Sequence, residues 1–511
     1  MIAAVDVGAV AEQVGVVVLA LLAAYAVLAA GRPELERLRA MAMVVAVLGT
    51  PGLLLAAIWD SPQVRPLHER PLVGGLAGLG GLAVVAILAV VISRRREAFP
   101  LLVVATLPFR VPISAGGQTS NLLVPLYAVV AAGVLAHGIE VLRGRPADPS
   151  EPVAGGLEWG LMGLVVLYAL QASYSHDFTN ALEQLVFFYV PFALVFVLLR
   201  RIHWTRRLLL ACLGVLVALA VVFVAVGLLE YSRRELLLNP KVISANMVES
   251  YFRVNSLFFD PNIYGRFLAI VMLAVTAAML WSERRREIVG AAVVLAVLWV
   301  GLMTSISQSS IAGLLLGLGI LAALRFSVRR TLAVAGALVV AGAVFVLVAG
   351  SAIRVDLSSS AKADKATTGR YNLIRGGIDL FDQRPVTGFG PGSFALEYRR
   401  REKSSSESAV SASHTIPITI AAEQGVAGLV LYLVVLAAAL GRLFGRGIRE
   451  SPARMAVAAG FGALVLHTLL YADFLEDPVT WTLLGIGTAL AAADARSRTG
   501  PPPGRAGPDP A

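Results

Sequence analysis

The stretch 208–229 reads LLLACLGVLVALAVVFVAVGLL, and none of its 22 residues is charged. A helix rises about 1.5 Å per residue, so this stretch extends for about 33 Å, enough to cross the roughly 30 Å of hydrocarbon in a bilayer. A helix also satisfies every backbone polar group within its own segment, which lipid cannot do. The stretch therefore predicts a transmembrane helix.

Similar apolar runs recur along the 511 residues, of which 57% are hydrophobic and 15% charged. That balance is atypical of a soluble domain. We predict an all-α fold, a polytopic transmembrane helix bundle with about 14 spans (about 13–15), and a long, partly helical extracytoplasmic loop near the C-terminal end. The predicted spans are near 13–30, 40–58, 72–92, 98–113, 121–142, 157–173, 184–199, 208–229, 262–281, 288–304, 310–325, 331–352, 416–440, 454–471 and 478–494.

Two of these runs need comment. The run 98–113 is short and contains Pro108 and Pro112, so it is either a short span or a re-entrant segment. The first run has no basic segment before it and no cleavage site, so we expect it to be retained as a span. Cys212 lies inside an apolar run, where we expect it to contribute packing alone.

The arginines predict an orientation. Of the 43 Lys and Arg residues, 25 fall in one set of alternating loops and three in the opposite short loops, and 15 lie in the segments 230–266 and 354–413. Positive charge in short loops marks the cytoplasmic side, whereas long loops cross regardless of charge. Both long segments are therefore predicted to be extracytoplasmic. The net charge of +10 is explained by orientation and requires no nucleic acid.

The same pattern divides the chain. We predict N-terminal transmembrane helices over 1–200 and central ones over 201–353, with an external loop at 230–261. The extracytoplasmic loop occupies 354–413 and the C-terminal helices 414–494. The tail 495–511, with Pro501 to Pro503, is predicted to be cytoplasmic and disordered.

The first external segment ends in Arg253-Val-Asn-Ser-Leu-Phe-Phe-Asp260-Pro261-Asn262. Asp260 is placed to cap a helix and Pro261 is tolerated in its first turn. Arg266 follows about one turn into the span. A cation there either has a partner or a wet cavity, or it extends to the interface. Arg253 is either a binding residue or a solvated charge.

The second external segment contains a predicted amphipathic helix. Leu373, Ile374, Ile378 and Phe381 recur at helical spacing between Arg370 and Gln383. Such a helix lies on the membrane or on the bundle, and Arg370 and Arg375 are on its N-terminal half, which favours anions. Gly388-Phe-Gly-Pro-Gly392 is predicted to be a tight turn and not a nucleotide loop. Residues 399–403 are predicted to be solvated and flexible.

Two further polar residues lie at the start of the span near 416–440. His414 is at its external end, where an imidazole could accept a proton from a hydroxyl, although such a histidine is also common as a polar loop residue. Glu423 lies about 10 Å deeper, where a carboxylate needs a cation, a proton or water.

A metal site has weak support. Asp473, Glu476 and Asp477 form an external acidic cluster, but no D-x-D pair, H-E-x-x-H motif or Cys/His cluster is present. We therefore predict no metal and no cofactor. His176, in a short external loop, offers little by itself.

Four stretches together resemble the O-antigen ligase and Wzy-type O-antigen polymerase superfamily of bacterial envelope glycosyltransferases. They occur in the order of that family: Arg253 to Asn262, Ser305-Ile-Ser-Gln-Ser-Ser-Ile-Ala-Gly313, Arg370 to Phe394, and His414 to Gly428. The chain departs from the family where Ser309-Ser310-Ile-Ala-Gly313 lacks the usual arginine, and where Thr415 replaces the usual asparagine. The likeness covers roughly residues 200 to 490.

The resemblance implies transfer of a glycan from a polyprenyl (undecaprenyl) diphosphate to an acceptor hydroxyl of a saccharide, lipid or protein, outside the bacterial cytoplasmic membrane. It implies His414 and Glu423 as catalytic residues. The leaving diphosphate would be bound by Arg253, Arg266, Arg370 and Arg375. Ligase and polymerase remain alternatives, and a transporter or flippase of lipid-linked saccharides or a non-catalytic scaffold are further ones.

Overall fold

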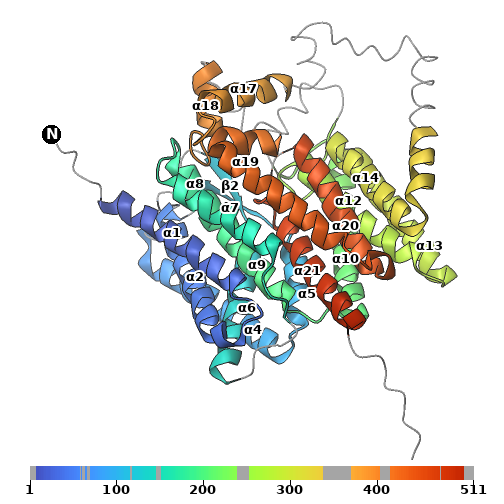
Figure 1. The fold of residues 1–511 in the computed structure, drawn as a ribbon, viewed down its shortest axis with the longest axis horizontal. Helices are drawn as coiled ribbons and strands as arrows, with labels where there is room; N and C mark the ends of the chain where they lie inside the picture. Colours follow the sequence, from blue (N-terminus) through green and yellow to red (C-terminus); the bar gives the residue numbers. More distant parts are fainter. Residues whose placement is uncertain are drawn as a thin grey trace, which may run out of the picture.

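The computed structural model describes residues 7–57, 59, 64–65, 69–115, 118–144, 151–238, 252–337, 370–402, 415–471 and 473–499. Figure 1 shows helices packed side by side in one bundle. The N-terminal helices are α1 (Val7–Leu28), α2 (Glu36–Ala57), α4 (Pro71–Arg94), α5 (Ala98–Thr106), α6 (Val124–Leu142), α7 (Gly156–Ala172), α8 (Phe178–Gln184) and α9 (Val190–Arg200). A π-helical turn, η2 (Leu185–Tyr189), joins α8 to α9.

The remaining helices are α10 (Arg206–Arg233), α12 (Pro261–Leu280), α13 (Arg285–Ser305), α14 (Gln308–Arg325), α17 (Arg370–Gln383), α18 (Phe394–Glu402), α19 (Ile416–Leu443), α20 (Pro452–Leu470) and α21 (Pro478–Thr499). Short 3-10 turns, η1 (Pro33–Leu35) and η3 (Ile448–Glu450), precede α2 and α20. Ten helical segments in the described residues are long and apolar enough to cross a membrane. The predicted all-α polytopic bundle is confirmed.

The predicted span at 98–113 is wrong in part. Its helix, α5, has only nine residues, about 14 Å at 1.5 Å per residue. An antiparallel pair follows, β1 (Val111–Ala115) with β2 (Gln118–Leu122), in which Val111 is opposite Leu122. Pro108 and Pro112 cannot donate helical hydrogen bonds, which explains why the helix ends there. Of the span predicted at 331–352, only residues up to 337 are described, and those are helical.

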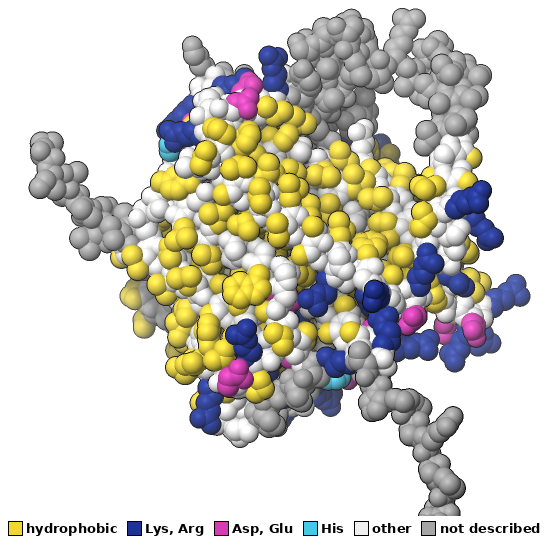
Figure 2. All heavy atoms as spheres, in the orientation of Figure 1, with side chains coloured by type: hydrophobic (Ala, Val, Ile, Leu, Met, Phe, Trp, Pro, Cys, Tyr) yellow, Lys and Arg dark blue, Asp and Glu magenta, His cyan; other side chains and the backbone are white. Residues whose placement is uncertain are grey.

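The bundle is apolar on its outside as well as inside. All eleven residues of α9 are buried, and α9 packs against α1, α6 and α21. On α4, by contrast, Leu72 is 83% and Leu76 70% exposed. Hydrophobic side chains cover most of the face drawn in Figure 2. An exposed apolar surface of this extent is what a lipid environment requires.

The two ends of the bundle differ in composition. We call one the arginine end: it contains the C-terminal ends of α1, α6, α9, α19 and α21 and the loops that follow them. The other is the loop end, which contains α17, α18 and the segments 107–123, 173–177, 252–260 and 471–477. In Figure 1, α17 and α18 lie at the top of the molecule, beyond α19.

Candidate functional site at the loop end

Helix α19 is interrupted near the loop end. Gly425 has φ +65° and ψ −162°, which is not helical. The carbonyls of Ala422 and Glu423 accept hydrogen bonds from Phe389 N (3.1 Å) and Gly390 N (2.8 Å), while Val426 N donates to Pro385 O (2.8 Å). The turn therefore satisfies the backbone groups that the interruption leaves without helical partners.

Glycine is required on the turn side of this contact. Gly388 has φ +66°, and a Cβ placed there would lie 2.1 Å from Glu423 O. A side chain would therefore have to displace the backbone of α19. The predicted tight turn at Gly388–Gly392 is confirmed, and its role is to dock onto α19.

The carboxylate of Glu423 faces this turn. It is 7% exposed, and its Oε1 accepts a hydrogen bond from Phe394 N at 2.9 Å. Phe394 is the first residue of α18, where free amides and the helix dipole favour an anion. The observed contacts of Glu423 therefore attach the start of α18 to α19.

The predicted amphipathic helix is confirmed with the predicted bounds, Arg370–Gln383. Leu373 and Leu380 of α17 are buried against a group of side chains from the turn, α18 and α19 (Phe389, Phe394, Tyr398 and Ala422). Leu373 and Leu380 thus lie on the protein, whereas Ile378, which was predicted for the apolar face, is 46% exposed. The prediction that 399–403 is flexible is wrong for residues 399–402, which form the last turns of α18.

The loop before α8 holds the other side of the turn. Tyr174, Ser175 and Asn180 donate side-chain hydrogen bonds to the carbonyls of Thr387, Pro391 and Gly392, each at 2.7 Å. His176 N donates to Phe389 O. A segment from the N-terminal half of the chain therefore positions the turn between α17 and α18.

His176 joins a small charged cluster. Its Nδ1 lies 2.8 Å from Glu397 Oε1 and its Nε2 lies 3.2 Å from Arg384 Nη1. Arg384 lies over the Phe389 ring at 4.7 Å, and Arg400 pairs with Glu397 at 2.6 Å. A neutral imidazole that donates from Nδ1 and accepts at Nε2 fits both contacts.

Arg253 is held against two of the sequence stretches. Its Nε donates to Ser305 O (3.1 Å) and its Nη2 to Asn262 Oδ1 (3.2 Å). Asn262 in turn accepts from Ser307 Oγ (3.0 Å). Two hydrogen bonds fix a planar guanidinium in orientation as well as position. Arg253 is thus an oriented, half-buried cation rather than a solvated charge.

Thr415, at the start of α19, is attached to the end of α20. Thr415 Oγ1 donates to Leu469 O (3.3 Å), near the end of α20. Tyr471, two residues beyond Leu469, donates from its hydroxyl to Asp260 Oδ2 (2.7 Å). Asp260 Oδ1 accepts from the amides of Asn262 and Ile263, so the predicted cap is confirmed. The end of α20 therefore connects the start of α19 to the start of α12.

Arg266 has an ion-pair partner. It is 3% exposed, and its Nη2 lies 2.8 Å from Asp477 Oδ2. It therefore does not extend to the interface. In the same segment, burial raises the pKa of Asp473 and raises the pKa of Glu476 well above its ordinary value, the latter helped by Asp473 and Glu423. The segment 471–477 thus holds carboxyl groups that retain protons more strongly than usual.

The other predicted residues are less closely defined. Arg370 begins α17, but its side chain, like the whole of His414, lies outside what the structure describes. Arg375 is exposed on α17 and contacts no acceptor in the described part of the chain. Among the described residues, no group of three His, Cys, Asp or Glu side chains is arranged to hold a metal ion.

Sequence reasoning did not single out Tyr471, His176 or Arg384. In the sequence, Tyr471 differs from its neighbours only as an aromatic residue at the end of a predicted span. Its hydrogen bond to Asp260 joins residues that are 211 positions apart. The contacts of His176 with Arg384 and Glu397 span more than 200 positions. No local motif signals such contacts.

These features define the class of the protein: it is a multi-pass membrane protein in which polar loops dock on one end of an apolar helix bundle. The family model described as O-antigen ligase matches residues 293–433. This segment runs from α13 into α19 and includes the docked turn. The predicted resemblance to the O-antigen ligase family is confirmed over this segment. No curated protein matches the chain.

Proposed function

We propose that the loop end transfers a glycan from a polyprenyl diphosphate carrier to an acceptor hydroxyl on the extracytoplasmic side of a bacterial cytoplasmic membrane. The family match supports an O-antigen ligase-like, glycosyltransferase-type enzyme. The donor, the acceptor, the side of the membrane and the residues are our proposal.

One observation carries this proposal: the stretches that resemble the family contact each other in two pairs at one end of the bundle, and the end of α20 links the two pairs. Arg253 and Asn262 bind the stretch 305–313. The turn after α17 docks on the stretch 414–428. Thr415 and Asp260 both contact the end of α20, through Leu469 and Tyr471. Residues more than 150 positions apart in the sequence are thereby gathered where a single substrate could meet them.

The proposed chemistry is a displacement at the anomeric carbon of the donor sugar. The acceptor oxygen forms a bond to that carbon as the bond to the diphosphate oxygen breaks. His414 takes the proton of the acceptor hydroxyl. Arg253 and Arg370 stabilise the negative charge that develops on the leaving diphosphate, because guanidinium groups bind phosphate oxygens in pairs.

The remaining predicted residues receive narrower roles. Arg266 is neutralised by Asp477, which supports a positioning role at the start of α12. Glu423 binds the amide of Phe394, which supports positioning of the external loop rather than proton transfer. Arg375 is exposed and is proposed as an outer contact for the diphosphate. Ligase and polymerase differ in the acceptor, and the same residues serve either.

The test is an assay of glycan transfer with a polyprenyl-diphosphate glycan and candidate acceptors. Arg253→Ala, Arg370→Ala and His414→Ala should each insert into the membrane normally and lose transfer by about 10²–10³-fold. The matched control is Arg70→Ala, which removes an exposed arginine at the start of α4 that makes no capping bond. It should keep full activity.

If all three variants transfer glycan at the normal rate, the site assignment is wrong. If the protein moves the lipid-linked donor across the membrane without transferring the glycan, a transporter or flippase is the correct reading. If the purified chain transfers no glycan and the three variants still support normal formation of the envelope glycan in cells, the protein is a scaffold.

A further inference from the structure

The turn between α13 and α14 is buried and strained. It carries four serines that are each at most 1% exposed: Ser305, Ser307, Ser309 and Ser310. Ile306 has φ +50° and ψ +38°, a left-handed conformation that a β-branched residue rarely adopts. Such backbone strain persists only where the surrounding contacts fix it, and it is common at functional sites. Buried hydroxyls in an apolar bundle require hydrogen-bond partners, so the partners of the serines show what this turn holds in place.

A glycine brings α20 against this turn. A Cβ placed on Gly313 of α14 would lie 2.9 Å from Ala463 O of α20, so a side chain there would push the two helices apart. Ser309 and His467 lie one helical turn from this contact on their respective helices. The Nε2 atom of His467 lies 3.2 Å from Ser309 Oγ, and His467 is 1% exposed. A buried imidazole is therefore joined to the serine turn.

The same serines reach the proposed site through Asn262 of α12. Asn262 Oδ1 accepts hydrogen bonds from Ser307 Oγ at 3.0 Å and from Arg253 Nη2 at 3.2 Å. Ser307 Oγ in turn lies 3.3 Å from Ser309 Oγ, the hydroxyl that contacts His467. A chain of four hydrogen bonds therefore connects the buried imidazole to Arg253.

The available donors fix the direction of this chain. A guanidinium only donates, so Asn262 must turn its oxygen, and not its NH2 group, towards Arg253. The hydroxyl of Ser307 donates its single proton to the same oxygen, so towards Ser309 it can only accept. Ser309 then donates to Ser307 and accepts from His467, which requires the imidazole tautomer with a proton on Nε2. If this chain is broken, the Asn262 amide is free to rotate and to present its NH2 group to the guanidinium, which it cannot bind.

We propose that His467 is a positioning residue for glycan transfer: its Nε2–H orients Ser309 and Ser307, and through them the Asn262 oxygen that holds Arg253. His467 itself touches neither the donor nor the acceptor. The inference rests on the proposed function, in which Arg253 stabilises the leaving diphosphate. The imidazole thus acts on the reaction from inside the bundle, only through Arg253.

The test measures kcat and KM for a polyprenyl-diphosphate glycan with the purified full-length chain. His467→Phe keeps a ring but removes the donor, and it should lower kcat by about tenfold, the size expected for one lost hydrogen bond. The loss is smaller than for Arg253→Ala because Ser310 Oγ, 2.8 Å from Ser307 Oγ, still contacts Ser307. The KM should stay within about twofold, because Arg253 acts on charge that develops only in the transition state. His467→Gln supplies an amide nitrogen near the position of Nε2 and should keep kcat within about threefold of the unmodified chain.

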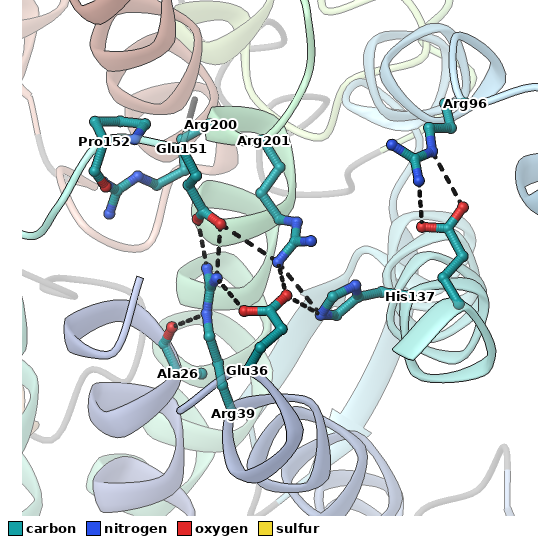
Figure 3. A network of polar contacts seen from close by, with 10 residues as sticks. Ala26, Glu36, Arg39, Arg96, His137, Glu151, Pro152, Arg200 and Arg201 are labelled. Carbon is teal, nitrogen blue, oxygen red and sulfur yellow. Dashed lines mark hydrogen bonds and ion pairs between the residues drawn. The ribbon is translucent and has the colours of Figure 1, made fainter. Parts of the chain in front are cut away.

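Two further variants keep the test independent of folding defects at His467. Ser309→Ala is a smaller change that removes the hydroxyl next to His467, and kcat should fall as it does in His467→Phe. The matched control is His137→Phe. His137 is an imidazole with 6% exposure in the polar network at the arginine end, where its Nε2 lies 3.3 Å from Glu36 Oε1 (Figure 3). This control should melt at a lower temperature and keep its kcat per folded molecule.

A double variant separates positioning from any other role of the imidazole. Arg253→Ala combined with His467→Phe should have the kcat of Arg253→Ala alone, because His467 acts through Arg253. Additive losses overturn the inference, and so does full kcat in either His467→Phe or Ser309→Ala, or a His467→Gln protein as slow as His467→Phe. Each of these outcomes leaves Arg253→Ala inactive and the proposed function intact. Full transfer by Arg253→Ala would instead overturn the proposed site and this inference together.

Discussion

The two ends of the bundle hold their polar groups by different means. At the arginine end, buried charges are matched by opposite charges at helix ends, as in Arg39 with Glu151 and Arg454 with Asp494. At the loop end, hydrogen bonds to backbone groups and uncharged side chains hold irregular backbone, as in the turn on α19 and in the contacts of Arg253, beside the ion pair of Arg266 with Asp477. We infer that the first arrangement fixes how helices pack, and we propose that the second positions groups for glycan transfer.

The largest expected effect is at the arginine end. Arg39→Met should reduce the free energy of unfolding by about 3–5 kcal/mol, because it leaves Glu36 and Glu151 buried without their partner. Thermal unfolding in detergent measures the loss. Transfer activity per folded molecule should be unchanged. An Arg39→Met, Glu151→Gln double variant should recover part of the stability, and a double variant no more stable than the single one would contradict the pairing.

Next is Arg253 at the loop end. Replacement of Arg253 by alanine should raise the activation free energy of glycan transfer by about 2.7–4 kcal/mol. This is the loss expected when one hydrogen-bond donor to the developing charge is removed. Arg253→Lys keeps the charge but cannot reach Ser305 O and Asn262 Oδ1 together. The activity of this variant should therefore fall between that of the unmodified chain and that of Arg253→Ala. The comparison between the two ends would break if Arg253→Ala unfolded the protein as strongly as Arg39→Met.

A smaller loss of stability should follow Gly388→Ala. The new Cβ would clash with Glu423 O, and the positive φ adds strain of about 1–3 kcal/mol. We expect a lower melting temperature together with reduced transfer, since the turn would leave α19. Gly290→Ala on α13, where nothing lies within 4 Å of the added carbon, is the control and should melt normally. Similar melting of both variants would refute docking of the turn.

Glu423→Gln should have a modest effect. The amide oxygen of the new side chain can still accept a hydrogen bond from Phe394 N, but the negative charge favoured at the start of α18 is lost. The free energy of unfolding should fall by about 0.5–1 kcal/mol. Transfer should persist at more than about one tenth of the normal rate. Complete loss of transfer in a stably folded Glu423→Gln protein would instead assign Glu423 to the chemistry.

The smallest effect is a change in pH dependence at the segment 471–477. Burial raises the pKa of Glu476 well above its ordinary value, so the folded state keeps a proton that the unfolded chain releases. The stability from this proton is complete below the ordinary carboxyl pKa of about 4.3 and is lost as pH rises through the folded-state pKa. Glu476→Gln should make the melting temperature fall less steeply over that range. An unchanged slope would exclude Glu476 as the cause.

Much of the fold could be predicted because its solvent is lipid. The apolar runs and the helix Arg370–Gln383 were located from periodicity, and the Asp260 cap from residue type. The short helix α5 with its hairpin was harder, because Val111 and Ile113 of β1 continue the apolar run of α5. Arg266 illustrates the limit: burial with a partner was one of the alternatives that the sequence left open, and the partner, Asp477, lies 211 positions away.

The sequence by itself determined which segments are apolar enough to span a membrane, which end collects arginine, and which family the chain resembles. Each is a property of neighbouring residues and their surrounding solvent, so no distant contact is needed to read it. The tertiary structure alone decided that the turn at Gly388 docks on α19, that Glu151 pairs with Arg39, and that Arg266 pairs with Asp477. Those outcomes depend on which helices lie side by side, and residue spacing along the chain does not specify that arrangement.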